Sequence, residues 1–191
     1  LTTSLKASYE LPSLNINLGG QYTLINEYIY FNENAIPTQL SSPINLIQFT
    51  LDQQINLGKF HLINIVAFQE SSEDVIRVPQ LSFKHSLYYQ NKWFRYLNIM
   101  IGADLRMLSS FTPYTYNPLV GQFILQNEEE LDWYPSVDFY LAFRVTKFQA
   151  YFKWENFTQQ IRTDELYFQT ANYPFSTGSG FRFGLRWRML D

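Results

Sequence analysis

The sequence has no cysteine among its 191 residues, so it forms no disulfide and no thiolate metal site. It has only two histidines, His61 and His85. Neither lies in the serine, cysteine or carboxylate pattern of a catalytic triad or a metal centre. We therefore predict that the protein is not an enzyme, and we expect no cofactor.

Long apolar runs and an excess of basic residues are also missing. The longest candidate span, 60–68, is too short to cross a bilayer as a helix and is interrupted by His61 and Asn64. A helical membrane protein is therefore excluded. The formal net charge is −3, which gives no support for a nucleic-acid partner.

Aromatic residues, by contrast, are abundant, and they make up 18% of the chain. Aromatic rings favour the boundary between apolar and wet surroundings. The last stretch, 181–190, shows how they are arranged, because side chains of an extended strand alternate between two faces. One parity is apolar: Phe181, Phe183, Leu185, Trp187 and Met189. The other parity is cationic or small: Arg182, Gly184, Arg186 and Arg188. This is the pattern of a strand that faces lipid on one side and water on the other.

The same alternation recurs along the chain and predicts nine strands. Their approximate ranges are 3–11, 14–26, 45–57, 60–69, 80–90, 93–108, 136–145, 148–157 and 181–190. Short turns are expected at Pro12-Ser13, Gly58-Lys59, Asn91-Lys92 and Thr146-Lys147. They alternate with long segments at 27–43, 70–79, 109–135 and 159–180, and residues 123–125 are a candidate extra strand.

Both the strand lengths and this strict alternation of connections are typical of outer-membrane barrels. We therefore predict an all-β fold: an antiparallel transmembrane up-and-down β-barrel, with residues 1–191 as one segment and no separate domain. A soluble lectin-like sandwich is the alternative fold.

Several short motifs, in this order and spacing, resemble the porin family of the Bacteroidota outer membrane. They are Val78–Phe83, Leu87–Tyr89, Ile101–Arg106, Tyr116–Pro118, Gly121–Phe123, Tyr134–Asp138, Lys153–Asn156, Tyr173-Pro174 and Phe183–Trp187. The resemblance extends over nearly the whole chain. It implies a β-barrel in the outer membrane of a Gram-negative bacterium, without implying a substrate.

Nine strands do not make a complete barrel of this kind. Bacterial single-chain barrels have an even number of strands and bring both termini to the periplasm. With a periplasmic C-terminus, the parity of the strands places Leu1 at the outer surface. We therefore expect this chain to be the C-terminal part of a larger barrel, with an odd number of strands before Leu1.

Charged residues on the polar parity are the candidate lumen lining. They are Lys84, Asp104, Arg106, Asp138, Arg144, Lys153, Glu155, Arg182, Arg186 and Arg188. Lys6, Glu10 and Asp52 have the same parity. A lattice of salt bridges between strands and an electrostatic filter that favours anions are both compatible with this set, and the same residues can serve as both.

Two further sets concern the membrane boundaries. Tyr88, Tyr89 and Trp93 are predicted to belong to the periplasmic aromatic girdle, and Trp133 and Tyr134 to the outer one. The long segments are acidic, including the run Glu128-Glu129-Glu130. They form either a solvated rim or sites for divalent cations that tie loops to one another or to lipopolysaccharide.

These features favour a porin that passes small hydrophilic solutes by passive diffusion. The alternatives are a non-conducting structural or docking barrel in a larger envelope complex and, with less support, an outer-membrane lipase or protease. Expected partners are outer-membrane lipid and lipopolysaccharide, together with other envelope proteins or further copies of the chain.

Overall fold

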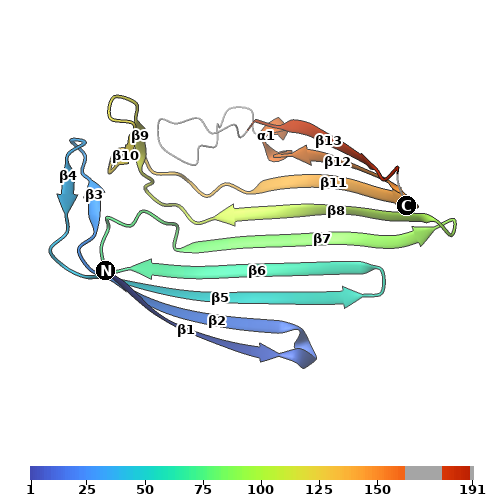
Figure 1. Ribbon diagram of the computed structural model, residues 1–191, viewed down its shortest axis with the longest axis horizontal. Helices are drawn as coiled ribbons and strands as arrows, with labels where there is room; N and C mark the ends of the chain where they lie inside the picture. The colour runs from blue at the N-terminus through green and yellow to red at the C-terminus, as the bar shows by residue number, and fades with distance from the viewer. Residues whose placement is uncertain (162–177, 190–191) are drawn as a thin grey trace.

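Nine long strands form a single antiparallel sheet in the computed structural model, which describes residues 1–161 and 178–189 (Figure 1). In sheet order they are β1 (Thr2–Leu11), β2 (Ile16–Ile25), β5 (Ile44–Leu57), β6 (Phe60–Ser71), β7 (Leu81–Trp93), β8 (Leu97–Leu108), β11 (Ser136–Val145), β12 (Phe148–Glu155) and β13 (Gly180–Trp187). Each long strand pairs with the long strands before and after it along the chain, so the predicted all-β antiparallel fold is confirmed.

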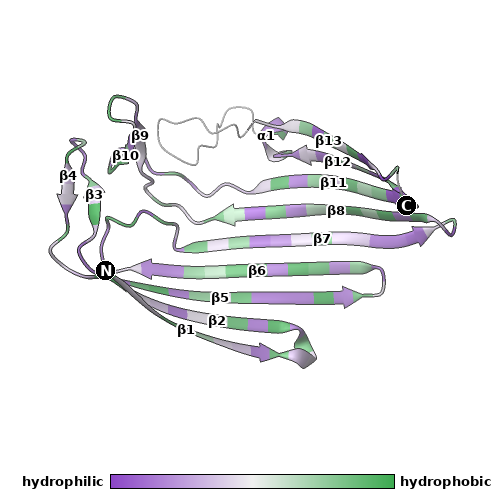
Figure 2. Cartoon of the chain, viewed as in Figure 1, coloured by the Kyte–Doolittle hydropathy of each residue, from purple (hydrophilic) through white to green (hydrophobic). Residues whose placement is uncertain are grey.

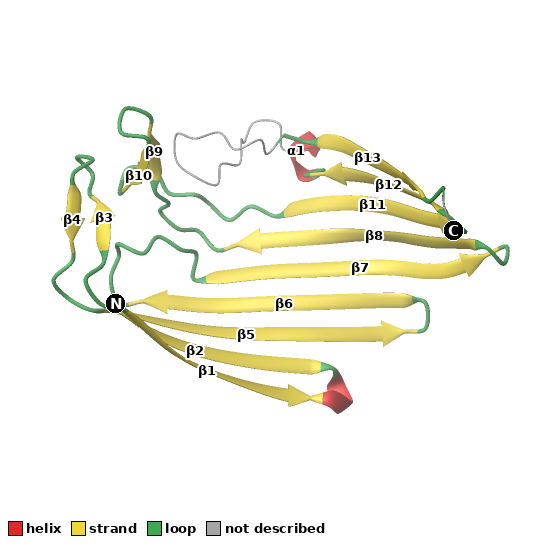
Figure 3. Ribbon diagram, in the orientation of Figure 1, coloured by secondary structure: helices red, strands yellow, loops and turns green. Residues whose placement is uncertain are grey.

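The remaining elements are short and lie in the segments that connect the long strands along the chain (Figure 3). They are η1 (Pro12–Leu14), β3 (Ile29–Phe31), β4 (Pro37–Gln39), β9 (Thr115–Asn117), β10 (Gln122–Ile124) and α1 (Thr158–Ile161). Pairing of β3 with β4 and of β10 with β9 makes a hairpin within each of two long loops. The strand predicted near 123–125 is therefore present as β10. In the described part of the chain, no helix is long and apolar enough to cross a membrane.

The alternation seen in the sequence is kept in register across the sheet, which gives it two distinct faces. One row across five strands is wholly apolar: Tyr89, Ile101, Leu141, Phe152 and Phe183 are successive partners. We call the face that carries this row the apolar face and the opposite one the polar face. Alternating green and purple segments follow the strands in Figure 2.

Large side chains of the apolar face are uncovered. Leu87, Ile101 and Phe183 are 53%, 47% and 71% exposed. Among the described residues only Ile44, Ile124, Leu125, Tyr134 and Ala150 form a buried apolar core. A soluble sandwich would cover this face with a second layer of sheet, but the long strands form one layer. So broad an apolar surface requires an apolar medium.

The turn between β7 and β8 differs from the prediction, and the structure assigns the faces of β6. The turn expected at Asn91-Lys92 lies instead at residues 94–96, because Asn91 and Lys92 continue the ladder opposite Ile99 and Asn98. Phe94 and Arg95 take the positive φ angles of the turn, 46° and 66°. Strand β6, whose faces the sequence left unassigned, places Ile63 and Ile65 on the polar face.

The short connections gather at one end of the sheet and the long loops at the other (Figure 1). Leu1 lies at the loop end, where its amino group donates to the Asn26 carbonyl oxygen at 3.1 Å. Within the described residues, β1 and β13 each pair with one neighbour, so the sheet is open and these two strands do not pair with each other. The total number of strands in the barrel stays a prediction.

Arginine at the centre of the apolar face is expected to destabilise the membrane-inserted protein. Leu51→Arg in β5 should cost about 2–4 kcal/mol, because the guanidinium would lie in hydrocarbon. Gln48→Arg, in the same strand on the polar face, is the matched control and should have little effect. Urea unfolding from lipid vesicles measures both. Equal stability of the two variants would contradict the assignment of the faces.

Candidate functional site

The polar face carries a compact group of charged residues on β8, β11, β12 and β13, which we call the charge cluster: Arg106, Asp138, Lys153, Glu155 and Arg182. Asp138 is its centre and is only 1% exposed. Its carboxylate forms ion pairs with the Arg106 guanidinium and with Lys153 Nζ, the latter at 2.9 Å. It also accepts a hydrogen bond from the backbone N–H of Asn156 at 2.8 Å. A buried carboxylate needs such partners to offset the loss of hydration.

Glu155 extends the charge cluster to the last strand. It lies 3.4 Å from Lys153 Nζ, and it forms a second ion pair, of 2.6 Å, with Arg182 Nε on β13. Five of the ten predicted lumen charges thus make one continuous lattice across four strands. Within it each of the three cations pairs with at least one of the two carboxylates, and the cluster keeps a formal charge of +1.

Asp104 and Lys84 lie on the same face but outside this lattice. Asp104 is directly opposite Asp138 across β8 and β11, yet the described residues give it no ion pair. Lys84 lies opposite Arg106 across β7 and β8. Although Asp104 and Asp138 are partners in the sheet, the carboxylate of Asp138 has two ion pairs and that of Asp104 has none among the described residues.

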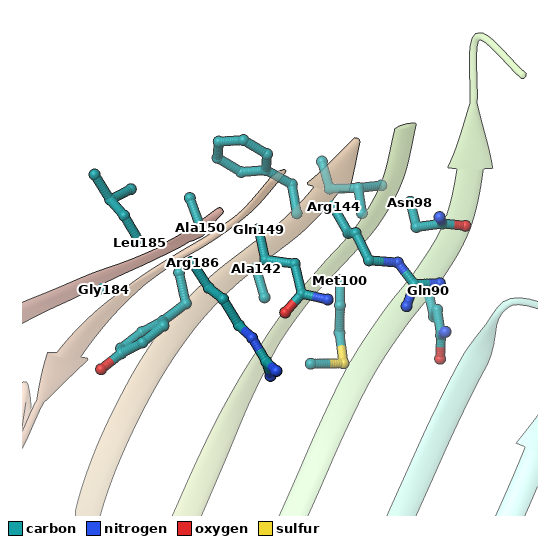
Figure 4. Close-up of a pocket in the computed structure, with 13 residues that line it drawn as sticks. Gln90, Asn98, Met100, Ala142, Arg144, Gln149, Ala150, Gly184, Leu185 and Arg186 are labelled. Atoms are coloured by element: carbon teal, nitrogen blue, oxygen red, sulfur yellow. The ribbon is translucent and has the colours of Figure 1, made fainter. Parts of the chain in front are cut away.

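Nearer the short turns, the polar face of β7, β8, β11, β12 and β13 is cationic and has no carboxylate. Five successive partners across β7, β8, β11, β12 and β13 form one row there: Lys92, Asn98, Arg144, Gln149 and Arg186. Segments 86–103, 139–154 and 178–189 contain no Asp or Glu. Arg144, Gln149 and Arg186 project from the same side of the sheet, beside a cavity of about 660 Å³ (Figure 4). Arg188 follows β13 and is exposed at the turn end.

Two glycines of the polar face lie against tyrosine side chains. Gly102 lies between Tyr88 and Tyr140, its partners on β7 and β11. Gly184 lies opposite Tyr151, and a Cβ added there would come within 2.2 Å of the ring. Any side chain at Gly184 would displace this ring, which shields the exposed backbone of the glycine. These pairs cannot be predicted from the sequence alone, because they depend on the register of neighbouring strands.

The residues predicted for the aromatic girdles fall in different places. Tyr89 and Trp93 have the parity of the apolar face, whereas Tyr88 has that of the polar face, where its ring stacks on His61 with centroids 4.8 Å apart. Trp133 is 57% exposed, but Tyr134 is buried and its hydroxyl is hydrogen bonded to Asn156 Oδ1 at 3.1 Å. The girdle role stays a prediction for all five residues, including Tyr88 and Tyr134.

Both histidines make ordinary structural contacts. His61 Nδ1 lies 2.6 Å from Asn56 Oδ1, and His85 Nδ1 lies 2.8 Å from Asn64 Oδ1. Asn64 in turn donates to Gln53 Oε1 at 3.1 Å, so a short polar chain crosses β5, β6 and β7 on the apolar face. Gln53, Asn64 and His85 satisfy part of one another's hydrogen-bonding capacity. This lowers the free-energy cost of placing polar side chains on the apolar face.

The long loops fold against one another at their end of the sheet. Leu125 N–H donates to the Phe31 carbonyl oxygen at 3.0 Å, which joins the loops of the two short hairpins. Arg77 Nη2 donates to Asn127 Oδ1 at 2.5 Å, and Asn127 also contacts Glu33. Buried Gln126 donates to the carbonyl oxygens of Pro113 and Glu129, both at 2.7 Å. Three loops that are distant in sequence thus share one hydrogen-bonded network.

The acidic run in this region does not assemble into a metal site. Among residues 1–161 and 178–189, no group of three or more His, Cys, Asp or Glu side chains is placed to hold a metal ion. Binding of divalent cations at these loops stays a prediction.

The whole sequence, residues 1–191, matches the protein family described as "Putative porin". The chain belongs to this porin family. No curated protein matches the sequence. The Bacteroidota origin implied by the resemblance stays a prediction.

Solved structures share the fold of the porin chain at low sequence identity. The FrpB iron transporter from Neisseria meningitidis (F3-3 variant) matches with a TM-score of 0.60 and 14% identity over 97% of the porin chain and 30% of its own. The ferric-catecholate import receptor Fiu from Escherichia coli K12 matches with a TM-score of 0.55 and 15% identity, over 96% and 26%. The chain therefore spans less than a third of either protein, and the likeness supports an outer-membrane β-barrel fold.

Removing the charge of the buried Asp138 carboxylate is expected to lower the free energy of unfolding of the porin chain. Asp138→Asn leaves the Arg106 and Lys153 charges without their common partner, which should cost about 1–3 kcal/mol. Asp104→Asn is the matched control and should cost less than about 1 kcal/mol, because Asp104 has no such pair. Urea unfolding in vesicles compares them. A larger loss for Asp104→Asn would contradict the central role of Asp138.

Tyr114 provides a pH-dependent test of the loop network. Its hydroxyl donates to the Val75 carbonyl oxygen at 2.5 Å, and burial, helped by a hydrogen bond with Tyr28, raises its pKa from 10.0 to about 12. The folded loops favour the neutral phenol, so their stability should fall as the pH rises from 10.0 towards about 12. The difference between the ultraviolet pH titrations of the wild type and of Tyr114→Phe gives the midpoint of Tyr114 ionisation. A midpoint near 10.0 would contradict the buried environment.

Proposed function

We propose that the porin chain forms part of an outer-membrane barrel through which small hydrophilic solutes diffuse passively. The observation that carries the proposal is the division of one sheet into an uncovered apolar face and a polar face with charged residues. In a barrel of this kind, the apolar face contacts lipid and the polar face lines a wet lumen. Family membership supports the same function.

The proposed location is the outer membrane of a Gram-negative bacterium, which the family and the fold support. Outer-membrane lipid would contact the apolar face, and lipopolysaccharide would adjoin the acidic loops. The proposal includes no covalent chemistry, because neither His61 nor His85 is paired with a nucleophile in the described residues.

We further propose that the lumen prefers anions. Seven of the ten predicted lumen charges are cations, and only Asp104, Asp138 and Glu155 are anions. The charge cluster pairs two of these three carboxylates with Arg106, Lys153 and Arg182. The remaining cations would raise the local concentration of anions in a narrow wet passage.

A second candidate is the non-conducting structural or docking barrel. It is favoured by the packing of the long loops into one network, because loops that fold together can close the end of a lumen. This barrel would keep the same faces but carry no current.

Planar-bilayer recording from the full-length protein separates the two candidates. The porin function predicts open single channels in potassium chloride, with a reversal potential in a salt gradient that indicates preference for chloride. Arg144→Gln together with Arg186→Gln should shift that potential towards cation preference. Stable insertion without conductance would support the non-conducting barrel, and a clear cation preference of the wild type would contradict the anion preference.

A further inference from the structure

Two arginines near the turn end of the polar face stand in one row with amide side chains between and beside them. Arg144 on β11 is the partner of Asn98 on β8 and of Gln149 on β12, and Gln149 is the partner of Arg186 on β13. We call Asn98, Arg144, Gln149 and Arg186 the donor row. Its guanidinium and amide groups offer hydrogen-bond donors from four adjacent strands.

The spacing of the donor row suits an anionic group. Neighbouring strands lie about 4.8 Å apart, so the backbones of Arg144 and Arg186 are separated by roughly 10 Å, with Gln149 midway. Arginine side chains are long enough to converge from both sides over such a gap. Both project from the same side of the sheet as Gln149, and Leu185 projects from the other (Figure 4).

The donor row differs from the charge cluster in having no carboxylate to compete for its cations. In the charge cluster, Arg106 and Lys153 already bind Asp138, and Arg182 binds Glu155. Neither Arg144 nor Arg186 has an ion pair among residues 1–161 and 178–189, and Lys92 adds a further positive charge to the same row. An anion binding there would therefore not have to displace a carboxylate of the described residues.

Small residues leave room beside the donors. The next row towards the loops contains Ala142 and Gly184, and the Tyr151 ring lies over Gly184. Met100 completes a partly apolar wall, and the cavity they share with the donor row measures about 660 Å³. That volume falls in the range of small-molecule sites, so the space suits a small organic anion with an apolar part.

We propose that the donor row is a binding subsite for oxyanions, namely the carboxylate or phosphate group of a small organic solute. The Arg144 and Arg186 guanidiniums donate to its oxygens in the forked geometry that arginine favours, and Gln149 and Asn98 add amide donors. Tyr151 and Met100 contact the organic part. The subsite deepens the proposed function and rests on it only in requiring that the polar face be wet.

Calorimetric titration of the full-length protein in nanodiscs with inorganic phosphate, and then with phenyl phosphate, tests the subsite at low salt. We expect saturable binding at one site, tighter for phenyl phosphate. Arg144→Gln with Arg186→Gln should weaken it at least about tenfold, as expected for loss of charged hydrogen bonds. Lys6→Gln with Lys84→Gln removes the same charge from the same face but outside the donor row, and should change the affinity less than about threefold.

Two results would overturn the subsite. One is the absence of saturable phosphate binding by the wild type, and the other is equal weakening by both double variants, which would indicate a diffuse field. Arg144→Lys tests the forked contact with the charge kept, and should give an intermediate affinity. If the double arginine variant fails to fold, Gln149→Leu provides the decisive comparison: weaker phosphate binding supports the subsite and unchanged binding overturns it.

A separate measurement of conductance distinguishes failure of the oxyanion subsite from failure of the proposed porin function. Saturable binding without conductance would retain the subsite and reject passive diffusion. Open channels without saturable binding would retain the porin function and reject the subsite.

Discussion

Backbone hydrogen bonding between long strands is the interaction on which the rest of this structure depends. A single-layer sheet has little core of its own, and among the described residues only five apolar side chains are buried. In hydrocarbon, each unpaired N–H or C=O group costs several kcal/mol, so strands must pair on both edges. The seven inner strands meet this requirement within the chain. Strands β1 and β13 meet it on one edge in the described residues, and the pairing of their other edges with further strands stays a prediction.

Because backbone hydrogen bonds hold the strands together, the side chains of the two faces can have different functions. The apolar face only has to match lipid, so its residues can vary while they remain apolar. The polar face is divided along the strands. Near the loops, Asp138 forms ion pairs with Arg106 and Lys153, and this lattice connects β8, β11 and β12. Near the turns, Arg144 and Arg186 are exposed and have no ion pair among the described residues, and we propose that they bind the anionic groups of solutes.

The loop network adds a third part with its own chemistry. Buried Gln126 satisfies backbone groups of its own loop, and Leu125 joins that loop to Phe31. Loops with buried polar groups need such internal bonds in order to keep one arrangement. In the proposed barrel, their position at one end of the sheet would make them the entrance to the lumen, and their packing would then decide whether a solute reaches the polar face.

The sequence by itself determined the nine long strands, the faces of all of them except β6, and the alternation of short and long connections. Period-two alternation is a local property of an extended chain, so Ser136–Val145 and the turns at Gly58-Lys59 and Thr146-Lys147 could be predicted without knowledge of any partner strand. Only the tertiary structure decided which side chains meet. The turn at Asn91-Lys92 was misplaced because pairing with Ile99 and Asn98 prolongs β7 through residues that elsewhere form turns. The contact of Asp138 with Lys153, the cover of Gly184 by Tyr151 and the alignment of Arg144 with Gln149 and Arg186 depend on register. Register is set by how several strands pair at once, and no single stretch of sequence contains that information.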